Sequence, residues 1–453
     1  MVELLLSYLV AAAGKSKVIR ALSKFSISSK ELSSKSFTVK IVRNTLRFLL
    51  TGSKNSLFMK ILKSSINPLA PVINIWGRAR KIRLITKIEA FLSKSYFIDN
   101  FLSPIAFLLM ALLFFTIANV LYGIRTLILI FSGLLSFLIG MLWGNIESKK
   151  LKPEVKESTI LFFGLIMIIM GFVGFFLQIR RVMAIPILNE AVRRRLSPKY
   201  NYMAWTSVPG TLYILSVFKK STKREGDFPI TLLLLIGVGF IPTFLLGYRT
   251  EMLAYFIGIL TVLYYRNYVS RLVLLLSTIF GAFLYMITSI VRLMFAGLTA
   301  NPFWAAAYRP TITAGFLEGI VMRYGWSEVT GGLIHLSAIS SLLRFVHGPR
   351  YGPRTLIGIY AGGRRGISTT ATIFAQFLLD FGIKGVILAM LFLGLLLSLA
   401  FNMARKKEAL LGPYATLLSY SLVGIETGIL DLNIYIYFAL SALVVLLSLR
   451  YQT

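Results

Sequence analysis

Residues 159–177 read TILFFGLIMIIMGFVGFFL and contain no charged side chain. A run of this length matches the roughly 20 apolar residues that an α-helix needs to cross a bilayer. Similar runs recur between short polar breaks from residue 103 onward, which predicts an all-α, polytopic transmembrane helical bundle of about 10 spans. The expected spans are approximately 103–122, 126–144, 159–177, 203–218, 228–246, 251–265, 271–291, 383–402, 412–429 and 433–449.

The composition agrees with a membrane protein. Of 453 residues, 57% are hydrophobic and 15% are charged, a balance that soluble domains of this length do not reach. The chain has no cysteine and two histidines, His335 and His347, which excludes disulfides, thiolate catalysis and metal sites built from cysteine or several histidines. We therefore expect no metal and no cofactor.

The formal net charge is +32, from 49 Lys and Arg against 17 Asp and Glu. In residues 1–100 these basic residues alternate with short apolar clusters that are too short to span. This pattern favours amphipathic helices on the cytoplasmic membrane surface, bound to anionic lipids, over a basic tail without fixed structure. Because the remaining charges interrupt spanning segments and form no folded basic face, we expect no nucleic-acid partner. Residues 101–453 then form one transmembrane domain.

The distribution of lysine predicts the orientation. Lysine-bearing loops follow the second, fourth and eighth spans, and Arg266 and Arg271 flank the turn between the sixth and seventh. Since short cytoplasmic loops retain Lys and Arg during insertion, these loops share the cytoplasmic side if both termini are cytoplasmic. The expected protein is a multi-pass plasma-membrane protein with external loops at about 178–203 and 292–382, the second of them long and placed between the seventh and eighth spans.

These two external loops contain many arginines and almost no lysine. Their arginines include Arg180, Arg181, Arg193, Arg194, Arg195, Arg292, Arg309, Arg323, Arg344, Arg350, Arg354, Arg364 and Arg365. Arginine binds phosphate or carboxylate in a bidentate way and stays charged in a partly dry site, so the bias predicts an anionic ligand. The alternative is pairing with lipid headgroups or with Glu190, Glu318 and Glu328, which are too few to neutralise the set.

Other residues of the external side are candidates for binding or catalysis. Arg249 lies in the short turn GYRTE beside a span, where an ionisable residue indicates either a functional site or an interfacial arginine. Ser368 and Thr370 follow a glycine-rich stretch and offer hydrogen bonds suited to sugar hydroxyls. The candidate general bases are His335, Glu328 and Asp380; His335 could instead be a satisfied interfacial histidine, and Asp380 could cap the eighth span.

Three segments resemble the oligosaccharide repeat unit polymerases, the Wzy-type branch of the O-antigen polymerase and ligase superfamily. They are AIPILNEAVRRRLSP at 184–198 with VPG at 208–210, GYRTE at 247–251, and GGRRGISTTAT with LLDFGIKG between 362 and 385. The resemblance implies a GT-C-like membrane glycosyltransferase that polymerises polyprenyl-diphosphate-linked oligosaccharides on the external face without a metal. It also implies that Arg193, Arg194, Arg195, Arg249, Arg354 and Arg364 hold diphosphate, and Arg292 is added from its position at the mouth of the seventh span.

Two other functions fit the same residues. A transporter or flippase of lipid-linked glycans or organic anions would also use arginines in a membrane cavity, although no repeated half is visible in the sequence. A ligase similar to the O-antigen ligases would use the same donor with a different acceptor. A chain-length regulator or a flippase is a possible protein partner.

Overall fold

The computed structural model describes residues 100–122, 126–188, 192, 195–218, 230–281, 302–343, 345–362, 369–370 and 372–451. All of them belong to the compact unit Glu89–Thr453. The predicted surface region at residues 1–100 lies, except for residue 100, outside the described residues, and it stays a prediction.

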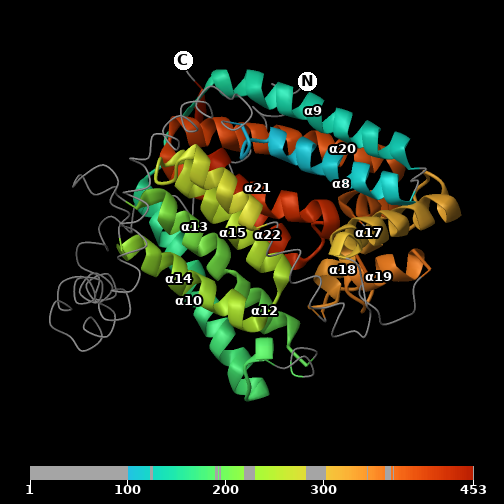
Figure 1. Cartoon of the computed structure of the whole chain (residues 1–453), viewed down its shortest axis with the longest axis horizontal. Helices are drawn as coiled ribbons and strands as arrows, with labels where there is room; N and C mark the ends of the chain where they lie inside the picture. Colours follow the sequence, from blue (N-terminus) through green and yellow to red (C-terminus); the bar gives the residue numbers. More distant parts are fainter. Residues whose placement is uncertain are drawn as a thin grey trace. The chain divides into compact units, whose positions relative to one another are not determined.

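The described chain is helical, so the all-α fold class is confirmed (Figure 1). In chain order the longer helices are α8 (Ile105–Tyr122), α9 (Leu127–Lys149), α10 (Glu157–Val182), α12 (Pro198–Trp205), α13 (Ser207–Val217), α14 (Ile230–Leu246), α15 (Arg249–Tyr265), a helix at Arg271–Gly281, α17 (Pro302–Tyr324), α18 (Leu333–Ser340), α19 (Pro353–Tyr360), α20 (Thr372–Lys406), α21 (Leu411–Thr427) and α22 (Leu432–Leu447). Short 3-10 turns lie at η1 (Pro186–Leu188) and η2 (Glu408–Leu410).

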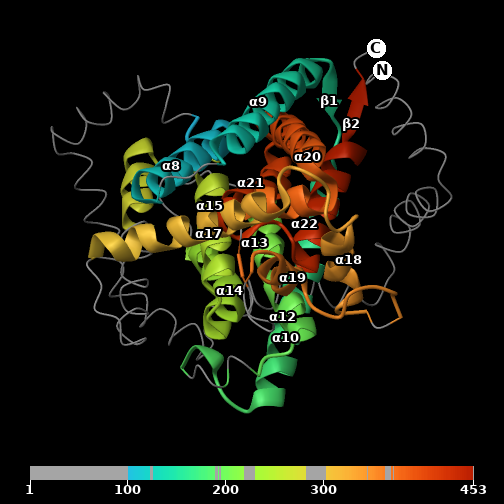
Figure 2. The ribbon, with the colours of Figure 1, turned by 90° about the vertical axis from the view of Figure 1, so that its right-hand side faces the viewer.

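Two three-residue strands form the single strand pairing of the described part. Strand β1 (Leu151–Pro153) runs antiparallel to β2 (Leu449–Tyr451), with Leu151 opposite Tyr451 (Figure 2). The pairing joins the segment after α9 to the end of α22, and Lys406 donates to the carbonyl of Leu151 at 2.8 Å. This sheet therefore ties together three helix ends that lie far apart in sequence.

As far as the structure describes them, the ten apolar segments expected to span are helical, and the seventh is described at Arg271–Gly281. Among the described residues, three helices are long and apolar enough to cross a bilayer: α9, α10 and α20. Shorter apolar helices lie at Ile105–Val120, Thr231–Leu246, Arg271–Gly281 and Leu432–Leu447. The helical nature of the segments is thus confirmed, whereas the number of crossings stays a prediction.

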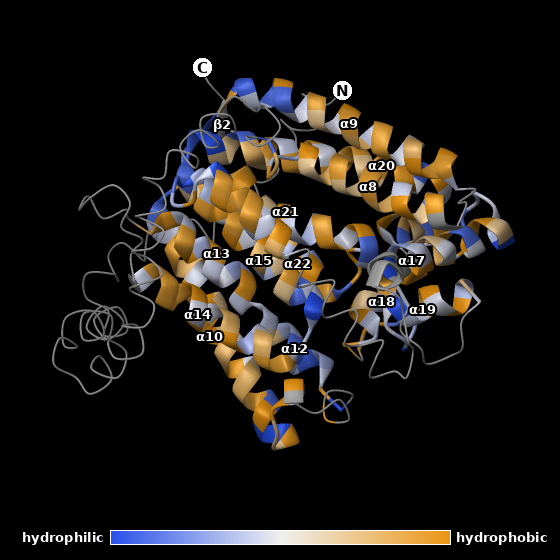
Figure 3. Ribbon diagram, viewed as in Figure 1, coloured by the Kyte–Doolittle hydropathy of each residue, from blue (hydrophilic) through white to orange (hydrophobic). Residues whose placement is uncertain are grey.

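Large apolar side chains on α9 face away from the protein interior. Phe131, Leu135, Leu142 and Ile146 are each more than half exposed, at 57%, 59%, 53% and 58%. Their spacing places them along one side of the helix, and a stripe of this kind is unstable in water but stable against lipid. Figure 3 shows hydrophobic residues along most of α9 and α20. These features define a membrane protein.

Close helix contacts in the bundle depend on glycine. A Cβ on Gly140 of α9 would lie 2.0 Å from the carbonyl oxygen of Leu391, and one on Gly394 of α20 would lie 2.1 Å from that of Phe137. Because each glycine meets the backbone of the other helix, α9 and α20 approach more closely than side chains would permit. The two helices lie side by side in Figures 1 and 2.

The fourth expected span, 203–218, is divided between α12 and α13 at Thr206. The Thr206 hydroxyl donates to the carbonyls of Met203 and Met167, both at 2.7 Å. Pro209 lies in the first turn of α13, and because proline has no N–H to donate to the carbonyl of Trp205 and its ring clashes with that carbonyl, it favours a break at this point.

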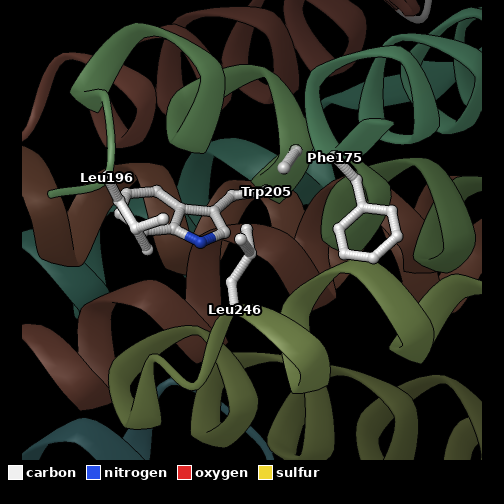
Figure 4. Packing of buried hydrophobic residues seen from close by; sticks show 5 residues of the cluster. Phe175, Leu196, Trp205 and Leu246 are labelled. Carbon is white, nitrogen blue, oxygen red and sulfur yellow. The ribbon is translucent and has the colours of Figure 1, made fainter. Parts of the chain in front are cut away.

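A small hydrophobic cluster fixes the end of the loop after α10 to the helices. Leu196, Trp205 and Leu246 pack with Phe175 and Ala204, as Figure 4 shows. Leu196 directly follows Arg195 in the stretch AIPILNEAVRRRLSP. The cluster thus holds the end of the arginine-rich stretch against α10, α12 and α14.

Candidate active site

The break in α20 organises the segment between α17 and α20, which was expected to be external. Gly382 has φ +63° and ψ −163° inside the helix range Thr372–Lys406, and a Cβ there would lie 2.9 Å from the carbonyl oxygen of Trp326. Glycine is required because other residues avoid this conformation and lack the space. The backbone N–H of Ile383 donates to the Trp326 carbonyl at 3.0 Å, and that of Thr330 donates to the Leu379 carbonyl at 2.9 Å. The segment 326–330 is therefore fastened to the break.

Asp380 lies at this break, is fully buried, and binds a second helix. Its Oδ1 accepts from the backbone N–H of Ile334 at 2.9 Å, and its Oδ2 accepts from that of His335 at 2.8 Å. The Thr330 hydroxyl and Nδ1 of His335 also hydrogen-bond to the carboxylate. Ile334 and His335 are the second and third residues of α18, so Asp380 caps α18 and the expected capping of the eighth span is absent.

The same carboxylate orients the imidazole of His335. An ionised carboxylate only accepts hydrogen bonds, so the hydrogen-bond geometry assigns the proton of the neutral imidazole to Nδ1. The Nε2 atom is buried and has no protein hydrogen-bond partner, while the side chain as a whole is 22% exposed. A neutral imidazole held in this way keeps the lone pair of Nε2 free of protein hydrogen bonds, as a general base requires.

Aromatic rings surround this imidazole. The ring centroids of Phe377 and Phe381 lie 5.1 and 5.4 Å from that of His335, and Tyr435 stacks at 6.1 Å with an interplanar angle of 23°. The Tyr435 hydroxyl is buried and has no protein hydrogen-bond partner. These rings restrict the imidazole and exclude water from part of its surface.

The guanidinium group of Arg354 is held by Asp431, one helical turn before Tyr435 at the start of α22. Nη2 of Arg354 donates to Oδ2 of Asp431 at 2.6 Å, and Asp431 precedes Tyr435 by four residues, which places both on one side of the helix. Burial alone would lower the pKa of the Arg354 guanidinium, but Asp431, Tyr202 and Glu251 outweigh it and raise this pKa above its ordinary value. Arg354 is therefore a permanent cation.

A second guanidinium group, that of Arg309, pairs with a carboxylate near the C-terminal end of α21. Nε of Arg309 lies 3.0 Å from Oε1 of Glu426. From the sequence, the carboxylates expected to pair with these arginines were Glu190, Glu318 and Glu328, which lie in the same loops. The partners found, Glu426 and Asp431, come from the ends of α21 and α22, so two of the expected free cations are paired with carboxylates.

The GYRTE turn contributes a buried carboxylate as well as an arginine. Arg249 begins α15 and is partly buried. Glu251 is 3% exposed, accepts a hydrogen bond from the Tyr420 hydroxyl, and accepts another from Nδ2 of Asn433 at 3.4 Å. This glutamate links α15 to Tyr420 of α21 and to Asn433 in the first turn of α22.

The other expected site residues lie apart from this group or outside the described residues. Arg195 is exposed and lines a hollow with Arg181, Val182 and Val192. Glu328 is exposed, and its side chain has no part in the Asp380 contacts. Thr370 is partly buried next to Thr369, whose N–H donates to the Arg354 carbonyl at 3.2 Å. The residues outside the described part are Arg193, Arg194, Arg292, Arg364 and Ser368.

Asp431 and Tyr435 were missed by the sequence analysis. A signal for Asp431 was present, since GILDLN at 428–433 places an acid between two apolar spans, where ionisable residues indicate function. Tyr435 carried no such signal, because a tyrosine in an apolar helix is usually a packing residue.

These features define a helical membrane protein that carries a histidine–carboxylate pair and a carboxylate-bound guanidinium group. The model of the family "Putative O-antigen polymerase" matches residues 100–438, and the chain belongs to this family. It is also similar to an uncharacterized protein of Methanocaldococcus jannaschii, 28% identical over 305 residues that make up 67% of this chain and 79% of the relative. No solved structure matches the chain.

Proposed function

We propose that the protein is a glycosyltransferase that polymerises oligosaccharide repeat units carried on polyprenyl diphosphate. The observation that carries the proposal is the His335–Asp380 pair, in which Nε2 of the imidazole is buried without a protein hydrogen-bond partner on a side chain that is partly exposed. Membership of the O-antigen polymerase family supports a lipid-linked oligosaccharide substrate.

The chemistry is a displacement at the anomeric carbon. Nε2 of His335 takes the proton of an acceptor sugar hydroxyl, whose oxygen forms a bond to the anomeric carbon of the donor. The bond from that carbon to the phosphate oxygen breaks, and polyprenyl diphosphate leaves with the electron pair. In this proposal Arg354 and other external arginines, among them Arg249 and Arg195, stabilise the charge that develops on the leaving group. No nucleotide sugar is needed, because the donor already carries a diphosphate.

The proposed membrane arrangement follows the lysine distribution. The site faces the external side of the plasma membrane, both termini are cytoplasmic, and the bundle crosses the bilayer about 10 times. Ser368 and Thr370 contribute hydrogen bonds to glycan hydroxyls. The basic region at residues 1–100 binds anionic lipids at the cytoplasmic surface.

The test uses purified full-length protein in detergent with lipid-linked oligosaccharide. The expected result is a ladder of longer glycans, which a transporter would not form and which needs no sealed vesicle. His335→Ala and His335→Gln should abolish the ladder, whereas the control His347→Ala, at an exposed histidine, should leave it unchanged. A ladder that persists in both His335 variants contradicts the base assignment. If the glycan is transferred only to an acceptor other than a lipid-linked repeat unit, the protein is a ligase.

A further inference from the structure

Asp431 begins α22 but does not cap it. As the N-cap residue it has φ −76° and ψ 142°, and its side chain makes no capping hydrogen bond. Aspartate is favoured at this position because its carboxylate can accept the N–H groups of the first turn, an interaction of about 1 kcal/mol. Here the carboxylate is turned to Nη2 of Arg354 instead.

The position of Asp431 is set by the backbone and by α20. Gly428 in the preceding turn has φ +75°, and the N–H of Ile429 donates to Oε1 of Gln376 at 3.0 Å. The Asp431 carbonyl accepts from the N–H of Ile434 at 2.9 Å. The carboxylate therefore sits on a turn anchored to the helix that also carries Asp380.

Arg354 is anchored only at its backbone and through Asp431. Its carbonyl accepts from the N–H of Thr369 at 3.2 Å, and it follows Pro353 in the first turn of α19. Its Nε is buried and has no protein hydrogen-bond partner. A long flexible side chain loses conformational entropy when it binds a ligand. If a partner already holds that side chain in place, less entropy is lost in the binding step.

We propose that Asp431 is a positioning residue: its carboxylate holds the Arg354 guanidinium so that Nε and the remaining N–H groups face the diphosphate of the lipid-linked substrate. The inference rests on the proposed function for its ligand. The planar guanidinium makes two parallel hydrogen bonds to a phosphate when its orientation is fixed. Asp431 itself touches Arg354 and not the reacting atoms.

The test is direct binding of a polyprenyl diphosphate to the purified full-length protein in detergent. Asp431→Ala should weaken binding by about 2- to 150-fold, the range for interactions between contacting residues. Asp431→Asn keeps an oxygen that accepts from Nη2 and should retain most of the affinity. The matched control is Glu408→Ala, which breaks the pair between Glu408 and Nε of Arg266 at 3.2 Å, an arginine outside the set assigned to the diphosphate, and should bind as wild type does.

A double-mutant cycle separates positioning from general damage. In an Arg354→Ala background, Asp431→Ala should cause no further loss of affinity, because the group it positions is already absent. Additive losses, or an Asp431→Ala variant that binds as wild type does, would overturn the positioning role. If the wild-type protein binds no polyprenyl diphosphate, the proposed function fails as well. If Asp431→Ala does not fold, Asp431→Leu, which has a similar volume and no acceptor, replaces it in the binding measurement and in the cycle.

Discussion

Asp380 accepts hydrogen bonds from both the backbone N–H and Nδ1 of His335, so one carboxylate fixes the start of α18 and the orientation of the imidazole. The two residues lie 45 positions apart in sequence. Rotation of the ring away from Asp380 would break the bond at Nδ1, while the carboxylate would keep its bonds to the backbone of α18. The carboxylate therefore favours one orientation of the imidazole at a position that the helix cap has already fixed.

Replacing Asp380 by Asn should separate the loss of charge from the loss of size. The amide keeps one acceptor oxygen but brings an NH₂ group toward Nδ1 or toward a backbone N–H, so the imidazole loses its preferred tautomer. We expect the polymerisation rate to fall by about 10²- to 10⁴-fold, as for other carboxylates that orient a histidine base. The measurement is the initial rate of ladder formation. Glu157→Gln, at an exposed carboxylate in the first turn of α10, is the control, and an equal fall in both variants would contradict the role of Asp380.

Gly382→Ala should destabilise the protein. The new methyl group would meet the Trp326 carbonyl oxygen at 2.9 Å in a backbone conformation that alanine avoids, at a cost of about 1–3 kcal/mol. Gly237→Ala is the control, because a Cβ at Gly237 meets nothing within 4 Å. Thermal unfolding in detergent should show a lower midpoint for Gly382→Ala and no decrease for the control. Equal midpoints would show that the break in α20 tolerates a side chain.

The helices were predictable from the sequence because an apolar run is a local property. Within the described residues the ten runs are helical, the seventh being described only as far as Gly281. The other ends differ by a few residues except in α20, which begins at Thr372 where the expected span began at 383. The additional segment 372–381, TIFAQFLLDF, was not expected to belong to the span because it contains the polar residues Gln376 and Asp380. Both polar residues are used in contacts with distant segments, Gln376 with Ile429 and Asp380 with α18.

The site was predictable only in part, for a different reason. His335, Asp380 and Arg354 were chosen by residue type and position, and the structure brings His335 and Asp380 together. Their partners could not be chosen in the same way, since Asp431 lies 77 residues from Arg354. Pairing across a helical bundle depends on which helix ends meet, and local sequence does not contain that information.

Glu251 should be more important for stability than for binding. Glu251→Ala would leave the Tyr420 hydroxyl and Nδ2 of Asn433 without their acceptor in the interior, at a cost of about 1–3 kcal/mol for each group left unpaired. Glu251→Gln keeps an acceptor oxygen and should lose much less. The free energy of unfolding in detergent measures both, and Tyr420→Phe in the Glu251→Ala background should recover part of the loss. An alanine variant as stable as wild type would show that water replaces the carboxylate.

The absence of cysteine from the chain makes the proposed orientation directly measurable, because any introduced thiol is the only one. Tyr351→Cys places a thiol in the second external loop at a side chain that is 52% exposed, and Lys156→Cys places one at an exposed position before α10. If that loop is external, a membrane-impermeant maleimide should label Cys at 351 in intact cells. It should label Cys at 156 only after permeabilisation, because the lysines around 156 remain on the cytoplasmic side. The reverse pattern would place His335 and Arg354 in the cytoplasm, away from a substrate presented outside, and would contradict external polymerisation. Labelling of both positions in intact cells would instead contradict the number of crossings expected between them.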